Sequence, residues 1–279
     1  MKMEHQNRLV AINDISGFGK CSLTVALPII SAAGVETICM PTAVLSTHTG
    51  GFTGYTYRDL TCDMPDISAH WNSIELKPDA IYSVFLGSFE QIDIVKKFAE
   101  DFKREDNLFI ADPCMADHGK MYAIFDEKFA KAMAGLCSKA DIILPNITEA
   151  CFLTDTDYRE TYDESYLRTL LEKLTQLGAK TIVLTGVGYT AGKTGVVVYQ
   201  EGTLRYYEHN KISKGCHGTG DIYASAFTGA LLNGKELLEA AKIAADYAVK
   251  CIENTQGDPD HWYGAKFETA LRDLMDMLA

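Results

Sequence analysis

Short apolar runs typical of β-strands alternate along this chain with segments of helical periodicity. Strand-like runs are expected at residues 8–13, 35–45, 80–87, 108–113, 141–146 and 180–186, and helical patterns follow Ser22 and cover residues 92–105. The runs show little polar alternation, which favours strands that are buried on both faces. The pattern predicts an α/β fold in which a mostly parallel central sheet is flanked by helices.

The pattern changes after residue 186. Two strand-like runs within residues 194–212 surround Glu201-Gly202, which predicts an antiparallel hairpin at the edge of the sheet. Two helical segments are expected to complete the chain. Because we find no internal repeat, low-complexity tract or linker, residues 1–279 are interpreted as a single domain.

Composition narrows the class of protein. The chain is 47% hydrophobic and 23% charged, without an apolar run long enough to cross a bilayer, which indicates a soluble globular protein. A net charge of −12 argues against nucleic acid or an anionic membrane as partner, although a local basic pocket for phosphate stays possible. The eight cysteines form no CxxC pair and the N-terminus lacks a long apolar signal core, so we expect a cytoplasmic location.

The stretch GCHGTGD, residues 215–221, runs straight into an apolar helical segment. Gly215, Gly218 and Gly220 allow backbone N–H groups to point into one concavity, and the helix N-terminus adds partial positive charge. Asp221 then lies where it could take a proton from a hydroxyl that attacks a phosphate held there. The alternative interpretation is a glycine-rich turn in which Asp221 is the N-cap of the helix.

Polar residues also follow the other predicted strands. In open α/β sheets ligands bind beyond the carboxyl ends of the strands, so these positions are candidates for a site. Carboxylates and an amide that converge near an anion hole suit a magnesium–nucleotide complex, since Mg²⁺ takes oxygen ligands and keeps several waters. The candidates are Asn13, Asp14, His48, Thr49, Asp112, Asn146, Glu149 and Thr185.

Five motifs carry a family resemblance: VLSTHTG (44–50), FLGSFEQ (85–91), ADPCMADHGKMY (111–122), DIILPNITEACFL (141–153) and GCHGTGD. In this order and spacing the chain resembles the pyridoxal kinase group of the ribokinase superfamily, and it is similar also to the hydroxymethylpyrimidine kinases of thiamine synthesis. The resemblance implies a ribokinase-like three-layer fold and transfer of the ATP γ-phosphate to the hydroxymethyl group of pyridoxal, pyridoxamine or pyridoxine. It further implies that Asp221 is the general base and that Gly218, Thr219 and Gly220 supply the anion hole.

The resemblance also assigns the remaining site residues. Asp112, Asp117, Asn146 and Glu149 resemble the set around Mg²⁺ and the ATP phosphates, with Asp117 and Glu149 toward the metal, and Thr185 resembles a phosphate contact. Substrate-binding roles fall on Asn13, Asp14, His48, Thr49, Phe85 and Tyr122. The implied cofactor is Mg²⁺, the co-substrate is ATP, a role for K⁺ stays open, and the expected assembly is a homodimer.

Two departures from the family pattern bear on the substrate. Phe85 stands where many pyridoxal kinases have a tyrosine that stacks on the ring. The opening NDISGFGKCS lacks the usual Gln-Ser-His and resembles a loop of the pyrimidine kinases, so either Asn13 or Asp14 could meet the pyridine nitrogen. Structural roles compete as well: His48 as a hydrogen-bonding residue, and Asn146 with Glu149 as helix caps.

Other functions are less compatible with the sequence. The segment GVGYTAGKTG is not a P-loop, because Val187 occupies the position of the required first glycine and a strand-like run follows Thr194. A non-catalytic ligand-binding relative should have lost Asp221 or the glycines before it, yet all are present. Hydroxymethylpyrimidine kinase is the main alternative enzyme.

Overall fold

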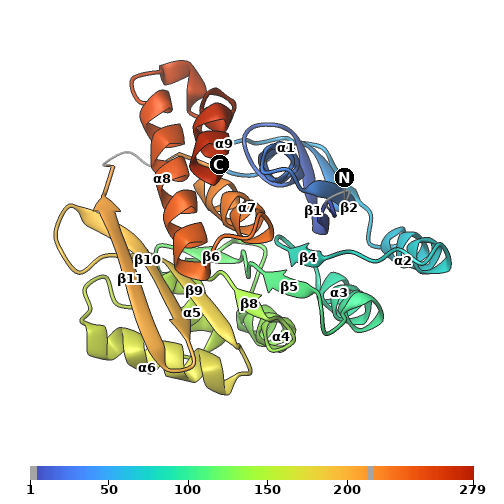
Figure 1. The fold of residues 1–279 in the computed structure, drawn as a ribbon, viewed down its shortest axis with the longest axis horizontal. Coiled ribbons are helices and arrows are strands. Elements are labelled where there is room, and N and C mark those ends of the chain that lie inside the picture. The colour runs from blue at the N-terminus through green and yellow to red at the C-terminus, as the bar shows by residue number, and fades with distance from the viewer. Residues whose placement is uncertain (1–4, 213–215) are drawn as a thin grey trace. The chain divides into compact units, whose positions relative to one another are not determined.

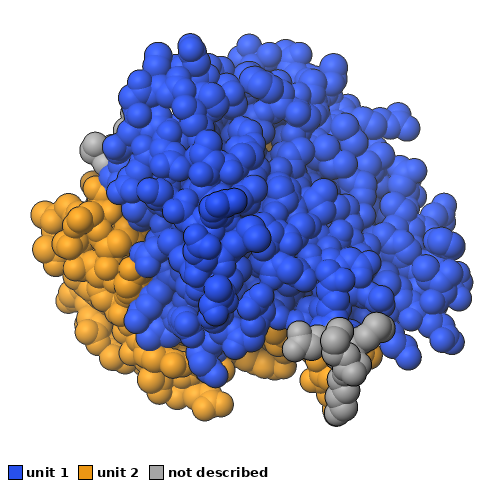
Figure 2. Space-filling model, turned by 45° about the horizontal axis from the view of Figure 1, so that its top comes forward, with its two compact units in different colours: residues 1–82, 212–279 blue, residues 83–211 orange. Residues whose placement is uncertain are grey.

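The computed structural model describes residues 5–212 and 216–279. The chain divides into two compact units, coloured separately in Figure 2. Unit 1 consists of residues 1–82 together with residues 212–279, and unit 2 consists of residues 83–211.

Unit 1 is built on parallel strands near the N-terminus. β1 (Arg8–Phe18) pairs in parallel with β2 (Glu36–Thr47), β3 (Tyr57–Asp59) pairs antiparallel with β2, and β4 (Ala80–Ser83) lies on the other side of β1. Residues 9–12 of β1 are fully buried, as their apolar sequence predicts. Of the candidate site residues, Asn13 and Asp14 lie within β1, and His48 and Thr49 directly follow β2.

The helices of unit 1 pack on β1 and β2 and on one another (Figure 1). They are α1 (Leu23–Ala32), α2 (Met64–Ser73), α7 (Thr219–Leu232), α8 (Leu237–Thr255) and α9 (Leu271–Leu278). α7 is buried on nearly all sides between α1 and α8, which explains its apolar sequence. The expectation of two helices after the hairpin was wrong, because a third helix, α9, follows two short 3₁₀ turns. Only Leu274 and Leu278 of α9 are buried, so its apolar pattern is short.

Unit 2 contains the second set of strands. In the order β11-β10-β9-β8-β5, the strands are β5 (Leu108–Ala111), β8 (Ile142–Ile143), β9 (Thr181–Val187), β10 (Lys193–Gln200) and β11 (Thr203–Asn210). β5, β8 and β9 are parallel. The helices are α3 (Phe89–Phe102), α4 (Glu127–Cys137), α5 (Ile147–Leu153) and α6 (Glu164–Gln176), and a small ribbon is formed by β6 (Ala116–Asp117) and β7 (Lys120–Met121).

The hairpin of β10 and β11 confirms the predicted edge of the sheet. Glu201 and Gly202 have φ values of 50° and 76°, as a two-residue turn between twisted strands requires. β10 begins at Lys193, so no helix follows the GKT sequence and a P-loop is excluded there. The mostly parallel sheet, the flanking helices and the antiparallel hairpin confirm the predicted α/β fold class. Within the ranges that the structure describes, no helix is both long and apolar enough to cross a membrane.

Candidate active site

The start of α7 forms the glycine-rich junction that the sequence predicted. Gly218 is the N-cap, with φ 77°, and a Cβ atom there would lie 1.6 Å from the carbonyl oxygen of Lys20. Only glycine is therefore compatible with this approach of two chain segments. A Cβ at Gly220 would meet nothing within 4 Å, so no described atom crowds that side of the first turn of α7. The first N–H groups of a helix have no partner within the helix and can bind an anion. Gly215 lies outside the described residues.

Asp221 is the third residue of α7 and not its N-cap. Its Oδ2 accepts a hydrogen bond from the backbone N–H of Ser22 at 3.0 Å, so the carboxylate joins two segments 199 residues apart. Burial raises the pKa of Asp221 to about 7; the Ser22 N–H and the Asn13 amide oppose this shift, and the charge of Asp14 adds to it. A carboxyl group that titrates near neutral pH is suited to act as a general base.

Asn13 and Asp14 are buried at a bulge of β1, with 1% and 4% of their surfaces exposed. Asp14 accepts hydrogen bonds from the hydroxyl groups of Ser22, at 2.6 Å, and Ser16, at 2.9 Å. Burial raises the pKa of Asp14, although both hydroxyls oppose the rise. The Asn13 amide lies close enough to Asp221 to lower the pKa of that carboxyl. Its Nδ2, however, has no hydrogen-bond partner of ordinary geometry. Asp14 is thus committed to neighbouring protein groups, which leaves Asn13 as the more available of the pair.

His48 is also held by the protein. Its Nε2 lies 2.7 Å from the carbonyl oxygen of Tyr263, and its Nδ1 accepts the backbone N–H of Gly50 at 3.1 Å. These partners define a neutral ring with the proton on Nε2. Burial lowers the pKa of His48, which agrees with a neutral ring. Thr49 beside it is exposed. His48 therefore has the structural hydrogen bonds that were the alternative to a role in binding the substrate ring.

In unit 2, Asn146 and Glu149 form a capping box at the start of α5. The Asn146 side chain accepts the N–H of Glu149, and the Glu149 carboxylate accepts the N–H groups of Asn146, at 2.9 Å, and Met115, at 3.1 Å. Burial raises the pKa of Glu149, and the nearby charge of Asp112 raises it further. Thr185 forms a parallel bridge with Asn146. Unit 2 thus brings together Asp112, Asn146, Glu149 and Thr185.

Tyr122 lies near the same carboxylates and near Asp117. Cys114 is the main cause of a raised pKa of Tyr122, burial is the second, and the charges of Glu149, Asp117 and Asp112 add to them. The side chain of Asp117 is 55% exposed and lies 3.5 Å from the ring of His118.

Phe85 lies 5.7 Å from Phe125, centroid to centroid, and is partly exposed. The aromatic face expected at position 85 is present.

The carboxylates of unit 2 could supply some, but not all, of the ligands of a magnesium ion. Asp112 and Glu149 are close enough to couple electrostatically, and carboxylate oxygens suit Mg²⁺. Residues 5–212 and 216–279 contain no group of three or more His, Cys, Asp or Glu side chains that could hold a metal. These residues fit a cation that is bound largely through water and phosphate oxygens, not one enclosed by protein ligands.

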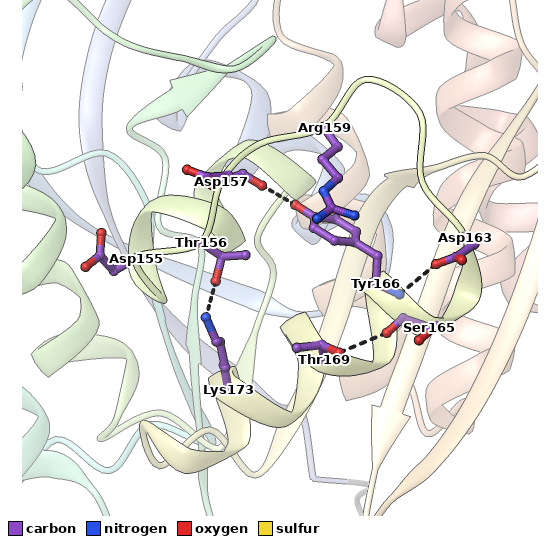
Figure 3. Close-up of a pocket in the computed structure, with 9 residues that line it drawn as sticks. All are labelled: Asp155, Thr156, Asp157, Arg159, Asp163, Ser165, Tyr166, Thr169 and Lys173. Carbon is purple, nitrogen blue, oxygen red and sulfur yellow. Dashed lines mark hydrogen bonds between the residues drawn. The ribbon is translucent and has the colours of Figure 1, made fainter.

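A pocket of about 470 Å³ opens in unit 2 between the end of α5 and the start of α6 (Figure 3). The polar groups of its lining bond to each other: Lys173 Nζ donates to Thr156 Oγ1 at 2.8 Å, and the Arg159 guanidinium lies 4.8 Å from the centre of the Tyr166 ring. None of the predicted site residues lines it.

Ser22, Tyr263 and His217 were not among the residues that sequence reasoning assigned to the site. Ser22 contacts both Asp14 and Asp221, Tyr263 holds His48, and the His217 ring lies 5.3 Å from that of His48. The contacts of Ser22 with Asp221 and of His48 with Tyr263 join residues 199 and 215 apart in the chain, so no local pattern could have revealed them. The contact of Ser22 with Asp14 spans only eight residues, but it depends on the unusual backbone conformation of Ser22.

Comparison with known proteins places the chain in a family of kinases. The phosphomethylpyrimidine kinase family model matches residues 27–264, and the chain belongs to this family. A Bacteroides thetaiotaomicron protein, assigned provisionally as a phosphomethylpyrimidine kinase, is 37% identical in sequence, with a TM-score of 0.93 and coverage of 98% of this chain and 96% of that one. A second crystal form of that protein contains pyridoxal and gives a TM-score of 0.91.

Two further relatives represent the two substrate classes. The pyridoxal kinase of Lactobacillus plantarum is 30% identical, with a TM-score of 0.89 and coverage of 98% of both chains. The hydroxymethylpyrimidine/phosphomethylpyrimidine kinase of Bacillus subtilis is 26% identical over 186 residues, which cover 66% of this chain and 66% of that protein. The match therefore spans about two thirds of that relative. The resemblance to the pyridoxal kinases of the ribokinase superfamily is confirmed at the level of family and fold.

Proposed function

We propose that this protein transfers the γ-phosphate of ATP to the hydroxymethyl group of a B6 vitamer and so forms the 5′-phosphate in B6 salvage. The observation that carries the proposal is Asp221 at the open N-terminus of α7, behind Gly218 and with a pKa near 7. A base with that pKa is poised to accept the proton of an attacking hydroxyl, and the adjacent N–H groups can stabilise phosphate oxygens.

The proposal gives the other candidates supporting roles. Gly218, Thr219 and Gly220 hold the transferred phosphoryl group through backbone N–H groups. Asp112, Asn146 and Thr185 bind the nucleotide phosphates, while Asp117 and Glu149 hold Mg²⁺ through its waters. Mg²⁺ would neutralise charge on the phosphates. Asn13, Phe85 and Tyr122 contribute to the substrate pocket, together with the loop that His48 and Thr49 begin.

The B6 assignment has a direct competitor. The pyridoxal found with the Bacteroides relative and the identity to a pyridoxal kinase favour a pyridine substrate. The family description and the Bacillus relative favour hydroxymethylpyrimidine, the substrate of the alternative thiamine-pathway reaction. Initial rates with MgATP should be compared for pyridoxal, pyridoxamine, pyridoxine, hydroxymethylpyrimidine and ribose. A preference for hydroxymethylpyrimidine replaces the B6 assignment, and no phosphorylation of any of them favours a non-catalytic relative.

Phe85 provides a test of the substrate class. Replacing Phe85 with alanine removes an aromatic face, so KM for pyridoxal should rise by about tenfold while KM for ATP changes little. Phe85→Tyr should stay within about threefold of the wild type, because it keeps the ring. Steady-state kinetics on pyridoxal and hydroxymethylpyrimidine check both variants. If Phe85→Ala leaves pyridoxal kinetics unaltered, the ring does not bind at this position.

The cellular setting and assembly complete the proposal. No disulfide forms between cysteines in the part of the chain that the structure describes, which suits a reducing cytoplasm. We expect a homodimer, as in the resembled family, and ask whether K⁺ stimulates the reaction. Light scattering that gives the mass of a single 30.7 kDa chain contradicts the dimer. Replacing K⁺ with Na⁺ in the rate measurement tests the monovalent cation.

A further inference from the structure

Ser22 has a conformation that its own helix does not explain. It is the N-cap of α1, yet its side chain makes no capping hydrogen bond. Its φ and ψ are 66° and −145°, a region that residues with a Cβ rarely adopt. A non-glycine residue persists there only where its surroundings determine its conformation. Something other than helix capping must hold Ser22.

The contacts of Ser22 identify what holds it. Its hydroxyl donates to Asp14 Oδ1 at 2.6 Å, and its backbone N–H donates to Asp221 Oδ2 at 3.0 Å. Asp14 is itself fixed in β1, since it is 4% exposed and its second oxygen accepts the Ser16 hydroxyl at 2.9 Å. Two consecutive hydrogen bonds therefore connect the strand to the carboxylate of Asp221, all within unit 1.

We propose that Asp14 and Ser22 are positioning residues for Asp221: the Asp14 carboxylate holds the Ser22 hydroxyl and thereby keeps the Ser22 N–H directed at the Asp221 carboxylate. This inference rests on the proposed function, in which Asp221 is the base. It changes the role expected for Asp14 from binding the substrate ring to orienting the catalytic group. With Oδ2 engaged by Ser22, Oδ1 of Asp221 is the oxygen that can receive the substrate proton.

The arrangement also bears on the charge state of Asp221. The Ser22 N–H favours the ionised carboxylate and opposes the effect of burial, while the negative charge of Asp14 disfavours it. Among the described residues, Cys21 also interacts with this carboxylate, and its pKa is raised by burial first and then by the charges of Asp221 and Asp14, so its thiol is neutral. Asp14 is a charged neighbour of Asp221. Loss of the Ser22 contact should therefore raise the pKa of Asp221.

Two substitutions at position 22 separate the hydroxyl contact from the backbone geometry. Ser22→Ala keeps the Cβ but loses the bond to Asp14, so the backbone should relax and kcat should fall by about tenfold, with both KM values within about twofold. Ser22→Gly also loses the hydroxyl, but glycine adopts this conformation readily, and kcat should fall by less than about threefold. The acidic limb of the pH profile of kcat should move to higher pH in Ser22→Ala.

Thr255→Val is the matched control. It removes a buried hydroxyl of the same unit, which donates to the carbonyl oxygen of Cys251 at 2.7 Å and accepts the N–H of Lys266 at 2.8 Å; among the described residues no hydrogen bond joins it to Asp14 or Asp221. Its thermal midpoint should fall, while kcat and its pH profile stay unchanged. Thermal melts of all variants separate misfolding from altered catalysis.

Conservative replacement of Asp14 tests the second hydrogen bond. Asn retains an oxygen that can accept from Ser22, so Asp14→Asn should lose less kcat than Asp14→Ala, which should resemble Ser22→Ala. The Asp14→Ala/Ser22→Ala double variant should lose little more than either single one, because both interrupt the same connection. Additive losses contradict the proposal.

The outcomes also separate this inference from the proposed function. If Ser22→Ala and Ser22→Gly lose equal activity, or neither moves the pH profile, Ser22 does not position Asp221 even though the enzyme is active. If the wild type phosphorylates no vitamer, or Asp221→Asn keeps its rate, the proposed function itself fails.

Discussion

Replacing Asp221 with asparagine should lower kcat by about 10²-fold or more while changing the KM for ATP much less, a loss typical of removing a general base. Asparagine is nearly isosteric and its oxygen can still accept the N–H of Ser22. The loss should therefore come from proton transfer and not from unfolding. Steady-state rates and a thermal melt of the same preparation measure both quantities. A variant with nearly native kcat contradicts the assignment of the base.

The same substitution should stabilise the fold at alkaline pH. Burial raises the pKa of Asp221 from 3.8 to about 7, so between these values the folded state binds a proton that the unfolded state has released. The stability associated with this carboxyl is full below its unfolded pKa and is lost as pH rises through about 7. Asp221→Asn removes that loss, and its thermal midpoint should exceed that of the wild type at pH 8 but not at pH 4.

The wild-type rate should depend on pH in the opposite direction to its stability. A general base works only when ionised, so kcat should rise with pH and level off above about 7, where the carboxylate predominates. The ionised carboxylate that catalyses is therefore the form that destabilises the fold. Active sites commonly lose stability in this way. A kcat that is flat from pH 5 to pH 8 contradicts the raised pKa.

Most of the fold follows from local sequence patterns. The fully apolar residues 9–12 predict a strand buried on both faces, and Glu201-Gly202 predicts the turn of the hairpin, because both signals act over a few residues. β1 continues through Gly17 to Phe18, beyond the predicted end at Asn13. Pairing with β2 as far as Thr47 overrides the local preference of Gly17 there, and no single-sequence pattern contains that information.

The positions of some candidate site residues could be predicted from signals of a helix start. Asp221, Asn146 and Glu149 lie beside helix N-termini, as the motifs indicated. The contact of Ser22 with Asp221 spans 199 residues and depends on tertiary packing, so the motif could not distinguish an N-cap from an oriented carboxylate. For His48 and Glu149 the sequence left a structural and a functional role open, and the structure shows that the structural contacts exist.

Glu149 is the residue for which both roles should appear in one variant. Its two carboxylate oxygens accept the N–H groups of Met115 and Asn146, so Glu149→Gln must turn an NH₂ group toward one of these donors. The free energy of unfolding should fall by about 1–3 kcal/mol, the cost of leaving a buried donor unpaired. If Glu149 also holds Mg²⁺ through water, the Mg²⁺ concentration for half-maximal rate should rise by about tenfold.

Asp163→Ala separates the two effects, because Asp163 caps α6 in the same unit through a 2.9 Å hydrogen bond from Tyr166 and has no assigned role in the site. It should lose about 1 kcal/mol of stability with an unchanged Mg²⁺ requirement. Glu149→Gln should differ from this control in its Mg²⁺ titration, measured at a temperature where both variants are folded. If the two titrations coincide, Glu149 only caps α5, and the nearby carboxylate of Asp112 becomes the residue to test for magnesium binding.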